Sequence, residues 1–196
     1  AAETGIDALV SALPHHCNRG IAAAARAAGL HYFDLTEDIA LAETVRTVAD
    51  GAATTFAPQC GLAPGFVSIA AAELIRHFDS LRSVKLRVGA LPQHPNNVLK
   101  YSLTWSTDGL INEYGNPCVS VVDGRRREVL PLEGREEIEI DGQLYEAFNT
   151  SGGLGSLAES FGARVENMDY KTIRYPGHCE QMRLLMTGLK LNQDRA

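Results

Sequence analysis

The sequence predicts a mixed α/β protein, in which a parallel sheet with alternating helices is followed by a mostly antiparallel sheet. Up to Pro58, short apolar runs alternate with helical segments, which is the rhythm of a doubly wound parallel sheet. After residue 80, short segments of alternating apolar and polar residues follow one another, and Asp-Gly pairs at 123–124 and 141–142 mark hairpin turns. These observations predict an α/β first part and an α+β second part.

The first part contains three expected strands and two expected helices. An apolar run that ends at Pro14 is typical of a buried parallel strand, and an alanine-rich helix is expected to end at Gly29, a suitable C′ residue. The elements are, in order, strand 8–14, helix 18–28, strand 32–36, helix 39–49 and strand 54–58. Ligands of such sheets bind beyond the carboxyl ends of the strands, which here lie near residues 11–14, 34–37 and 59–65.

The turn Gln59-Cys60-Gly61-Leu62-Ala63-Pro64-Gly65 runs directly into an apolar helix expected over 66–78. Pro64 suits the first turn of a helix, where its missing N–H costs nothing. The free N–H groups of a helix that begins here could bind a carboxylate or phosphate. The alternative is a strand-to-helix connection that needs glycine geometry and binds nothing.

The second part is expected to form a mostly antiparallel sheet with helices on one face. Its expected strands are 84–89, 99–106, 119–123, 127–132, 136–140 and 144–148, and its expected helices are 64–78, 154–161 and 178–189.

Six motifs in order resemble one protein family. They are Ser11-Ala12-Leu13-Pro14, Tyr32-Phe33-Asp34-Leu35-Thr36, Gly61-Leu62-Ala63-Pro64-Gly65, Gly89-Ala90-Leu91-Pro92, Tyr101-Ser102-Leu103-Thr104-Trp105-Ser106 and Ile173-Arg174-Tyr175-Pro176-Gly177-His178. Together they resemble the saccharopine dehydrogenase family, most closely its lysine 6-dehydrogenase-like branch. The resemblance implies an NAD(P)-dependent oxidoreductase that acts at a CH–NH bond of lysine or a lysine-derived amino acid.

The resemblance also implies a division of labour along the chain. Residues 1–62 would be the C-terminal half of a Rossmann-like NAD(P)-binding domain, and residues 63–196 a substrate-binding domain that forms a homodimer. The glycine-rich turn that holds the cofactor pyrophosphate in family members has no counterpart before Ser11. We therefore expect a truncated portion of an enzyme that binds NAD or NADP poorly and is inactive alone.

The resemblance assigns cofactor-binding residues to the strand ends. Ser11, Leu13 and Pro14 would line the nicotinamide end. The opposite wall of the cleft would be formed by Asp34, Thr36 and Glu37. In the turn that follows, Leu62, Pro64 and Gly65 would bind the cofactor, and Gly61 would contact the substrate.

Gly153-Leu154-Gly155-Ser156-Leu157-Ala158 formally matches the dinucleotide fingerprint G-x-G-x-x-G/A. The preceding strand, 144–148, is expected to be the second limb of a hairpin and therefore antiparallel, so the match lies outside a βαβ unit. A helix start that binds a substrate anion, or that only turns the chain, is the preferred interpretation.

Trp105 and Tyr114, at the start and the end of a short helical segment, are expected to contact the substrate. Saccharopine-cleaving relatives carry an arginine where this chain has Asp108. Losing a guanidinium removes bidentate carboxylate recognition, which favours a lysine-like diamino acid over saccharopine. Asp108 could instead face a substrate ammonium. The backbone from Thr150 to Gly152 could receive an α-carboxylate.

The segment from Lys171 to His178 offers further polar groups, and Lys171 is one of the expected substrate contacts. Lys171 and Arg174 are an odd interval apart and should face opposite sides of a regular strand. Arg174 or Tyr175 could bind a substrate carboxylate, and His178 could exchange protons near neutral pH. For each of these residues a purely structural role stays open.

The implied reaction removes hydride from the amine carbon of lysine, and water then releases ammonia from the resulting iminium. The substrate ammonium has an unperturbed pKa of ~10.4, so a base is needed. The candidates are Glu113, Asp108 and His178. Two alternatives stay open: a non-catalytic, dimerising fragment that binds an amino acid or a protein, and a saccharopine-type reductase.

Composition and charge exclude some other classes. The net charge of -6 argues against a nucleic-acid partner, and the sequence has no run of the ~20 apolar residues that span a bilayer. The cysteines Cys17, Cys60, Cys118 and Cys179 are scattered and no secretory signal is evident, so we expect reduced thiols in a cytoplasmic protein. No metal site is expected.

Overall fold

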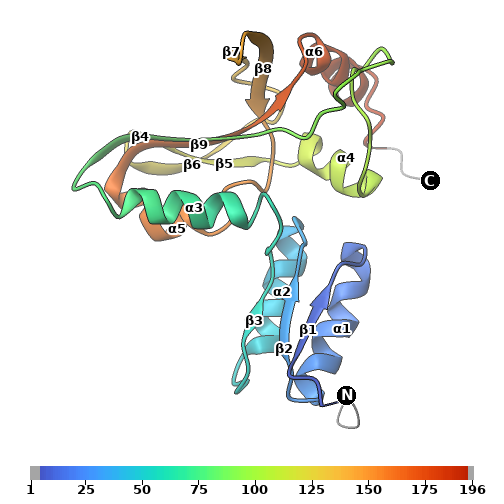
Figure 1. Cartoon of the computed structure of the whole chain (residues 1–196), viewed down its shortest axis with the longest axis vertical. Helices are drawn as coiled ribbons and strands as arrows, with labels where there is room; N and C mark the ends of the chain where they lie inside the picture. Colours follow the sequence, from blue (N-terminus) through green and yellow to red (C-terminus); the bar gives the residue numbers. More distant parts are fainter. Residues whose placement is uncertain (1–4, 194–196) are drawn as a thin grey trace. The chain divides into compact units, whose positions relative to one another are not determined.

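The computed structural model describes residues 5–193, and the chain divides into two compact units, Ala1–Ala70 and Ala71–Ala196 (Figure 1). Each unit has its own sheet. The mixed α/β fold class with one parallel and one mostly antiparallel sheet is thereby confirmed. The division of function at residues 62 and 63 stays a prediction.

The first unit is a small parallel sheet with two helices. Strands and helices alternate as expected, and their bounds are β1 Ala8–Ser11, α1 His15–Ala27, β2 His31–Asp34, α2 Ile39–Ala49 and β3 Phe56–Ala57. The strand order is β1-β2-β3 and both pairings are parallel. Helix α2 has the predicted bounds because Asp38 caps it, with Oδ1 accepting a 2.7 Å bond from the Leu41 N–H.

Helix α1 begins at His15, three residues before the predicted start. Pro14 occupies the N-cap position, and its carbonyl accepts a 3.0 Å bond from the Cys17 N–H. The first strand consequently ends at Ser11 rather than at Pro14, because the segment between them already prepares the helix.

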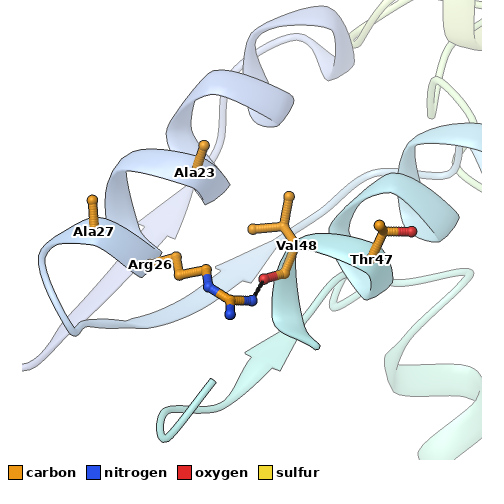
Figure 2. Close-up of a pocket in the computed structure, with 5 residues that line it drawn as sticks. All are labelled: Ala23, Arg26, Ala27, Thr47 and Val48. Carbon is orange, nitrogen blue, oxygen red and sulfur yellow. Dashed lines mark hydrogen bonds between the residues drawn. The ribbon is translucent and has the colours of Figure 1, made fainter. Parts of the chain in front are cut away.

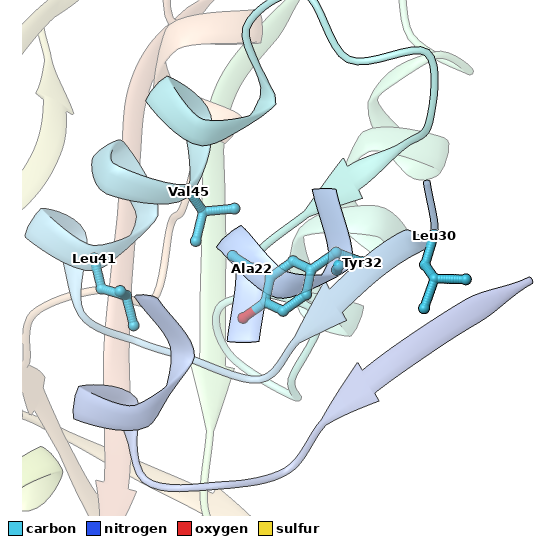
Figure 3. Close-up of a cluster of buried hydrophobic side chains, with 6 residues drawn as sticks. Ala22, Leu30, Tyr32, Leu41 and Val45 are labelled. Carbon is cyan, nitrogen blue, oxygen red and sulfur yellow. The ribbon is translucent and has the colours of Figure 1, made fainter. Parts of the chain in front are cut away.

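The core of the first unit lies between its sheet and its two helices (Figure 3). Tyr32 of β2 is fully buried, and its ring stacks 5.7 Å from that of Phe56 in β3. The helices contribute small and branched side chains, among them Ala22, Leu41 and Val45. The alanine-rich sequence of α1 thus allows close approach of helix and sheet.

The predicted role of Pro64 at the start of a helix is wrong. Helix α3 spans Phe66–Ile75, and Pro64 lies in the turn before it. The N–H groups of Phe66 and Val67 donate to the carbonyls of Gly61 and Leu62, at 2.8 and 3.0 Å. The loop itself therefore satisfies the first donors of α3, which favours the alternative that this turn binds no anion there.

Gly65 is required by this turn. Its φ is 134°, and a Cβ built on it would lie 2.1 Å from the Gly61 carbonyl oxygen. A residue with a side chain rarely adopts this φ, and its Cβ would clash with a backbone atom that cannot move aside, so this position requires glycine.

The second unit is built around the long strand β9. Its strands are β4 Leu81–Val88, β5 Cys118–Val122, β6 Arg125–Val129, β7 Glu136–Ile140, β8 Gln143–Asn149 and β9 Val165–Arg174. The order is β6-β5-β9-β8-β7, and β4 pairs with β9 as the only parallel neighbour among the described strands of this sheet. The expected hairpins at 123–124 and 141–142 join β5 to β6 and β7 to β8.

Three helical regions complete the second unit besides the end of α3. They are α4 Thr107–Gly115, α5 Leu157–Phe161 with a short 3-10 turn at Gly162–Arg164, and α6 His178–Arg183 followed by a π-helical turn at Leu184–Gly188. The predicted single helix 178–189 is thus divided. Tyr114, Phe148, Cys179 and Met182 form the core beside α4 and α6.

The predicted strand 99–106 is wrong, because residues 99–106 are irregular. Asn97 makes local hydrogen bonds to both the N–H and the carbonyl of Tyr101, at 3.3 and 2.7 Å. Such local bonds replace a strand ladder. The Tyr101 ring is thereby turned into the interior, where it is 8% exposed.

Replacing Gly65 tests whether the turn before α3 is needed. Gly65→Ala should lower the free energy of unfolding by about 3 kcal/mol, since the new Cβ meets backbone in a conformation that alanine rarely adopts. Gly20→Ala is the matched control. A Cβ there, inside α1, meets nothing within 4 Å, and helix propensity predicts a gain of about 0.5–1 kcal/mol. Urea titrations that find the two variants equally stable would contradict the role of Gly65.

Candidate functional site

The three predicted strand ends of the first unit lie side by side. Ser11 pairs in register with Asp34, and the N–H groups of Gln59 and Cys60 donate to Asp34 Oδ1 and to its carbonyl, at 3.2 and 2.8 Å. The Thr36 N–H donates to the same carboxylate at 2.9 Å. Asp34 therefore ties the ends of β2 and β3 together.

The Asp34 carboxylate is fully buried, and both of its oxygens accept hydrogen bonds. Asp34 is 0% exposed, and its Oδ2 accepts a 2.8 Å bond from the Tyr32 hydroxyl. Burial and the Asp34 carboxylate together raise the pKa of Tyr32. Ser11 is buried as well, with its hydroxyl 2.6 Å from Asn18 Oδ1. Ser11, Asp34 and Thr36 thus hold the strand ends in place, a role that the sequence analysis did not assign to them.

Other predicted cofactor residues remain open to a ligand. Leu13 and Leu62 are 57% and 55% exposed, and Pro14 is exposed too. Pro64 and Gly65 are buried in the turn. Glu37 differs from both groups, because its Oε1 is buried and has no partner among the described residues.

A shallow pocket lies between α1 and α2, lined by Ala23, Arg26, Ala27, Thr47 and Val48 (Figure 2). The Arg26 guanidinium donates to the Val48 carbonyl. These residues belong to the second half of each helix, which leads back to the amino ends of the parallel strands. The pocket is therefore at the opposite end of the sheet from Ser11 and Asp34. The guanidinium of Arg26, which lines it, is already hydrogen-bonded to the backbone.

In the second unit the structure brings together Arg174, Tyr114, Glu113 and His178. Arg174 ends β9, Glu113 and Tyr114 lie in the last turns of α4, and His178 begins α6. Arg174, Tyr114 and His178 are 4%, 1% and 2% exposed. Four of the predicted substrate or catalytic residues thus form a single cluster in the interior of the second unit.

The hydrogen bonds in this cluster have fixed directions. His178 Nδ1 lies 2.8 Å from the Leu99 carbonyl, which can only accept, so Nδ1 carries the proton. Nε2 of the neutral ring must then accept from the Tyr114 hydroxyl, 3.0 Å away. The Tyr114 oxygen in turn accepts from Arg174 Nε at 2.9 Å. We call this chain, from Arg174 through Tyr114 and His178 to the Leu99 carbonyl, the relay.

His178 is held neutral by its surroundings. Burial lowers its pKa to about 4; the bond to Leu99 opposes the shift, and the nearby Arg174 charge adds to it. Both ring nitrogens are hydrogen-bonded, which gives His178 a positioning role in this arrangement. Proton exchange by His178 stays a prediction.

Arg174 is fixed on several sides. Its NH1 donates to the Ile173 carbonyl at 2.9 Å, and its guanidinium carbon lies 4.8 and 5.8 Å from the ring centres of Tyr101 and Tyr114. Its NH2 is 3.8 Å from Glu113 Oε1, near the limit of an ion pair. Burial alone would lower the pKa of Arg174, but Tyr114 and Glu113 outweigh it and the net shift is upward.

Asp108 and Trp105 lie apart from the buried relay. Asp108 is exposed in the first turn of α4, whose N-cap is Ser106. Trp105 is 40% exposed, and its indole N–H donates to the Tyr101 hydroxyl at 3.1 Å. The two residues are therefore available to a ligand at the start of α4.

Thr150 is 2% exposed, and its hydroxyl oxygen has no partner among the described residues. Its neighbour Ser151 donates from its N–H to the Glu113 carbonyl at 2.9 Å, so this loop lies against α4. Gly152 has a φ of 86°, which glycine supplies freely. Gly61, by contrast, belongs to the first unit, where it forms a bridge with Gly65.

Lys171 and Tyr175 have structural partners. Lys171 Nζ lies 2.7 Å from the Gly134 carbonyl and 3.1 Å from Glu136 Oε2, away from the relay, as the odd spacing from Arg174 predicted. The Tyr175 hydroxyl donates to the Pro92 carbonyl at 3.0 Å. Neither residue joins the Arg174 cluster.

The apparent dinucleotide fingerprint has a packing explanation. Strand β8 is antiparallel to both of its neighbours, as expected, and α5 has only five residues. A Cβ on Gly153 would lie 2.2 Å from the ring of Tyr170. Gly153 therefore makes room for an aromatic side chain.

Sequence reasoning missed two buried residues. Tyr101 was placed in a strand, although its ring packs on Arg174 and His178. Glu146, 2% exposed in β8, accepts a 2.6 Å bond from the Cys179 N–H and thus stabilises the start of α6. A charged residue within an otherwise apolar strand was the available signal for Glu146.

The described residues contain no group of three or more metal-ligating side chains, and none of the described helices is long and apolar enough to cross a bilayer. All four cysteines are free thiols.

Removing the Tyr114 hydroxyl tests the relay. Tyr114→Phe should lower the free energy of unfolding by about 1–3 kcal/mol, because Arg174 Nε and His178 Nε2 lose their buried partner. Tyr170→Phe is the control, since Tyr170 is also buried but no described residue hydrogen-bonds to its hydroxyl. Equal losses in the two variants, measured by chemical denaturation, would rule out a special role for the Tyr114 hydroxyl.

The pKa of His178 predicts a pH dependence. Its folded pKa of about 4 lies below the ordinary value of 6.5, so the unfolded state binds the proton first as the pH falls. His178 should leave stability unchanged above pH 6.5 and lower it by about 3 kcal/mol by pH 4. An NMR titration, with the His178 signal assigned by its absence in His178→Asn, should show a neutral ring at pH 5. A midpoint near 6.5 would contradict this.

Comparison with known proteins extends this description. A model of the family "Saccharopine dehydrogenase C-terminal domain" matches residues 61–194. The structure is similar to that of apo saccharopine dehydrogenase (L-Glu forming) from Saccharomyces cerevisiae, with a TM-score of 0.72 and 20% identity over 97% of this chain and 45% of that chain. A second match, yvaA from Bacillus subtilis, has a TM-score of 0.40 and 11% identity over 87% of this chain and 47% of that chain, which is too low to support an inference.

The chain thus spans less than half the length of the yeast enzyme to which its fold is similar. The family match covers all strands of the second unit, together with Asp108, Thr150 and the relay. The chain belongs to the saccharopine dehydrogenase C-terminal domain family.

Proposed function

We propose that this chain takes part in an NAD(P)-dependent oxidation at the CH–NH bond of lysine or a lysine-derived amino acid. The observation that carries the proposal is the family match over residues 61–194. The parallel β1-β2-β3 sheet, which lies before the matched region, supports it, because such sheets bind nucleotides at their carboxyl ends. The carboxylate of Asp108, where saccharopine-cleaving relatives carry an arginine, supports assigning the chain to the lysine 6-dehydrogenase-like branch.

The carboxyl end of the parallel sheet fits a nicotinamide cofactor in one respect. Glu37 Oε1 is a buried acceptor without a described partner, suited to a ribose hydroxyl or an amide N–H. Leu13 and Leu62 offer apolar surface in the same unit. When bound, NAD(P)+ would accept hydride from the amine carbon of the substrate.

Asp108 supports lysine as the substrate rather than saccharopine. Its carboxylate is exposed at the start of α4, where it can attract a substrate ammonium but repels an added carboxylate. Among the three base candidates it is also the best suited to accept a proton, since His178 is used in the relay and Glu113 lies beside Arg174.

A non-catalytic binding role is the second candidate. The observation that favours it is the burial of Ser11, Asp34 and Thr36, which leaves fewer polar groups for a cofactor than the sequence suggested. In either case we propose that the second unit forms a homodimer, a proposal that sedimentation analysis can test.

Binding measurements with Asp108 variants test the substrate assignment. By titration calorimetry, we expect wild type to bind L-lysine more tightly than saccharopine, and Asp108→Arg to reverse this order by about tenfold or more through a new carboxylate contact. Asp108→Asn should weaken lysine binding and should improve saccharopine binding less than Asp108→Arg does, because it removes the repulsion without adding a carboxylate contact. Glu159→Arg, which changes an exposed acid in the first turn of α5, is the charge control.

Turnover is followed separately through absorbance at 340 nm, with lysine or saccharopine and with NAD+ or NADP+. We expect the chain alone to be inactive while it binds lysine. Tighter binding of saccharopine by wild type would favour a saccharopine-type reductase. A dimer that binds neither amino acid nor cofactor would favour the non-catalytic role.

A further inference from the structure

Helix α3 has the composition of a buried helix. All of its residues except Ser68 and Glu73 are apolar, and a helix that is apolar on every side is normally covered by other elements. In α3, however, Ile75 is the one buried residue, at 2% exposure. The helix, labelled in Figure 1, therefore presents an apolar surface that the described residues leave uncovered.

The exposed apolar residues follow one line along the helix. Phe66, Ala70 and Leu74 are four residues apart, and Phe78 lies four residues further, in the turn after the helix. Residues at i and i+4 are neighbours on a helix surface, so the spacing of the first three is set by the helix itself. Phe66, Leu74 and Phe78 are 64%, 64% and 54% exposed, and Ile69 beside them is 69% exposed. We call Phe66, Ala70, Leu74 and Phe78 the α3 ridge.

The order of large and small residues on the α3 ridge is self-complementary. If two copies of the ridge cross in opposite directions about a two-fold axis midway between Ala70 and Leu74, then Leu74 of each copy packs on Ala70 of the other. Phe66 of each copy then meets Phe78 of the other. A two-fold interface requires such a pattern, since residue i must fit residue j and residue j must fit residue i. Packing of i±4 ridges is also the commonest way in which two helices pack.

The exposed apolar area is sufficient for a small dimer interface. A whole aromatic side chain has roughly 150–250 Å² of surface. Scaled by their exposed fractions, the side chains of Phe66, Ile69, Leu74 and Phe78 expose about 500 Å² on each copy. Two copies would thus cover ~1,000 Å² in total, the size at which a specific interface is expected.

The charged residues beside the α3 ridge are paired with one another. Arg76 donates to one Glu73 oxygen at 3.3 Å, and the other oxygen lies 3.4 Å from His77 Nε2. These exposed side chains would form the polar rim that surrounds the apolar centre of most interfaces. The ridge itself carries no charge, so covering it avoids the large cost of burying one.

We infer that α3 is the surface through which two copies of this chain associate, with Leu74 of each copy packed on Ala70 of the other. The occupant of the α3 ridge is thus a second copy of the chain. The inference rests on the homodimer in the proposed function and adds the surface and the residues that form it. The family match over residues 61–194 includes the whole of α3.

Leu74→Glu tests the surface. By sedimentation velocity, wild type should show a concentration-dependent equilibrium of monomer and dimer. Leu74→Glu should weaken the dimer at least about 100-fold, because its carboxylate would be buried without a partner. Leu184→Glu is the matched control, since it places the same charge on a leucine of the second unit that is 60% exposed, and it should dimerise like wild type. Far-UV circular dichroism checks that both variants keep the fold.

Exchanging the two central residues tests the pairing itself. Ala70→Leu and Leu74→Ala should each weaken the dimer about tenfold, the first by overfilling the contact and the second by emptying it. The double variant again places a large residue opposite a small one and should recover most of the lost affinity. A double variant as weak as the two single effects combined would show that these residues do not meet, and the inference would be wrong.

The inference and the proposed function fail on different measurements. A wild type that stays monomeric overturns the inference. A Leu74→Glu variant that dimerises as strongly as wild type also overturns it, but leaves a homodimer that uses another surface. Neither result changes the preference for L-lysine over saccharopine, which Asp108→Arg tests. Absence of that preference in wild type would overturn the proposed substrate and leave the α3 interface intact.

Discussion

The hydrogen bond from His178 Nδ1 to the Leu99 carbonyl sets the direction of the bond between His178 and Tyr114, the residue that holds Arg174. Because the carbonyl can only accept, the proton on Nδ1 forces Nε2 to accept from Tyr114, and the Tyr114 oxygen then accepts from Arg174. The same bond anchors the irregular segment before α4 to the start of α6. The buried, neutral ring of His178 therefore connects the conformation of the chain at Leu99 to the orientation of the Arg174 guanidinium.

Asp34 has a comparable role in the first unit. Its carboxylate joins two strand ends by accepting from Tyr32, Thr36 and Gln59. A charge buried in this way is stable only because several donors surround it. In both units, several polar residues that the sequence marks as site candidates hydrogen-bond to the backbone and hold it in place. The groups that remain available to a ligand include Glu37 Oε1, Asp108 and Thr150.

The sequence predicted the fold well where hydrophobic periodicity and local turn chemistry agree. Helix α2 has an Asp38 cap, and strand β7 precedes an Asp-Gly turn; both have the predicted bounds. Prediction failed at residues 99–106, where an apolar pattern reflects packing of Tyr101 on Arg174 rather than a strand. It also failed at Pro64. The first N–H groups of α3 donate to carbonyls of the preceding loop, and the loop conformation that brings them together cannot be read from composition. The pairing of Tyr114 with His178, 64 residues apart, is a tertiary contact of the same kind.

The central claim is that a neutral His178 donates to the Leu99 carbonyl, accepts from the Tyr114 hydroxyl, and thereby orients Tyr114 toward Arg174. Nitrogen-15 NMR of the imidazole ring at pH 7 tests it most directly, since the two ring nitrogens differ strongly in chemical shift when one is protonated. The account predicts a proton on Nδ1 and a bare Nε2 for His178, with the assignment made from the spectrum of His178→Asn. A ring protonated on Nε2, or on both nitrogens, would reverse the Tyr114 hydrogen bond and contradict the account.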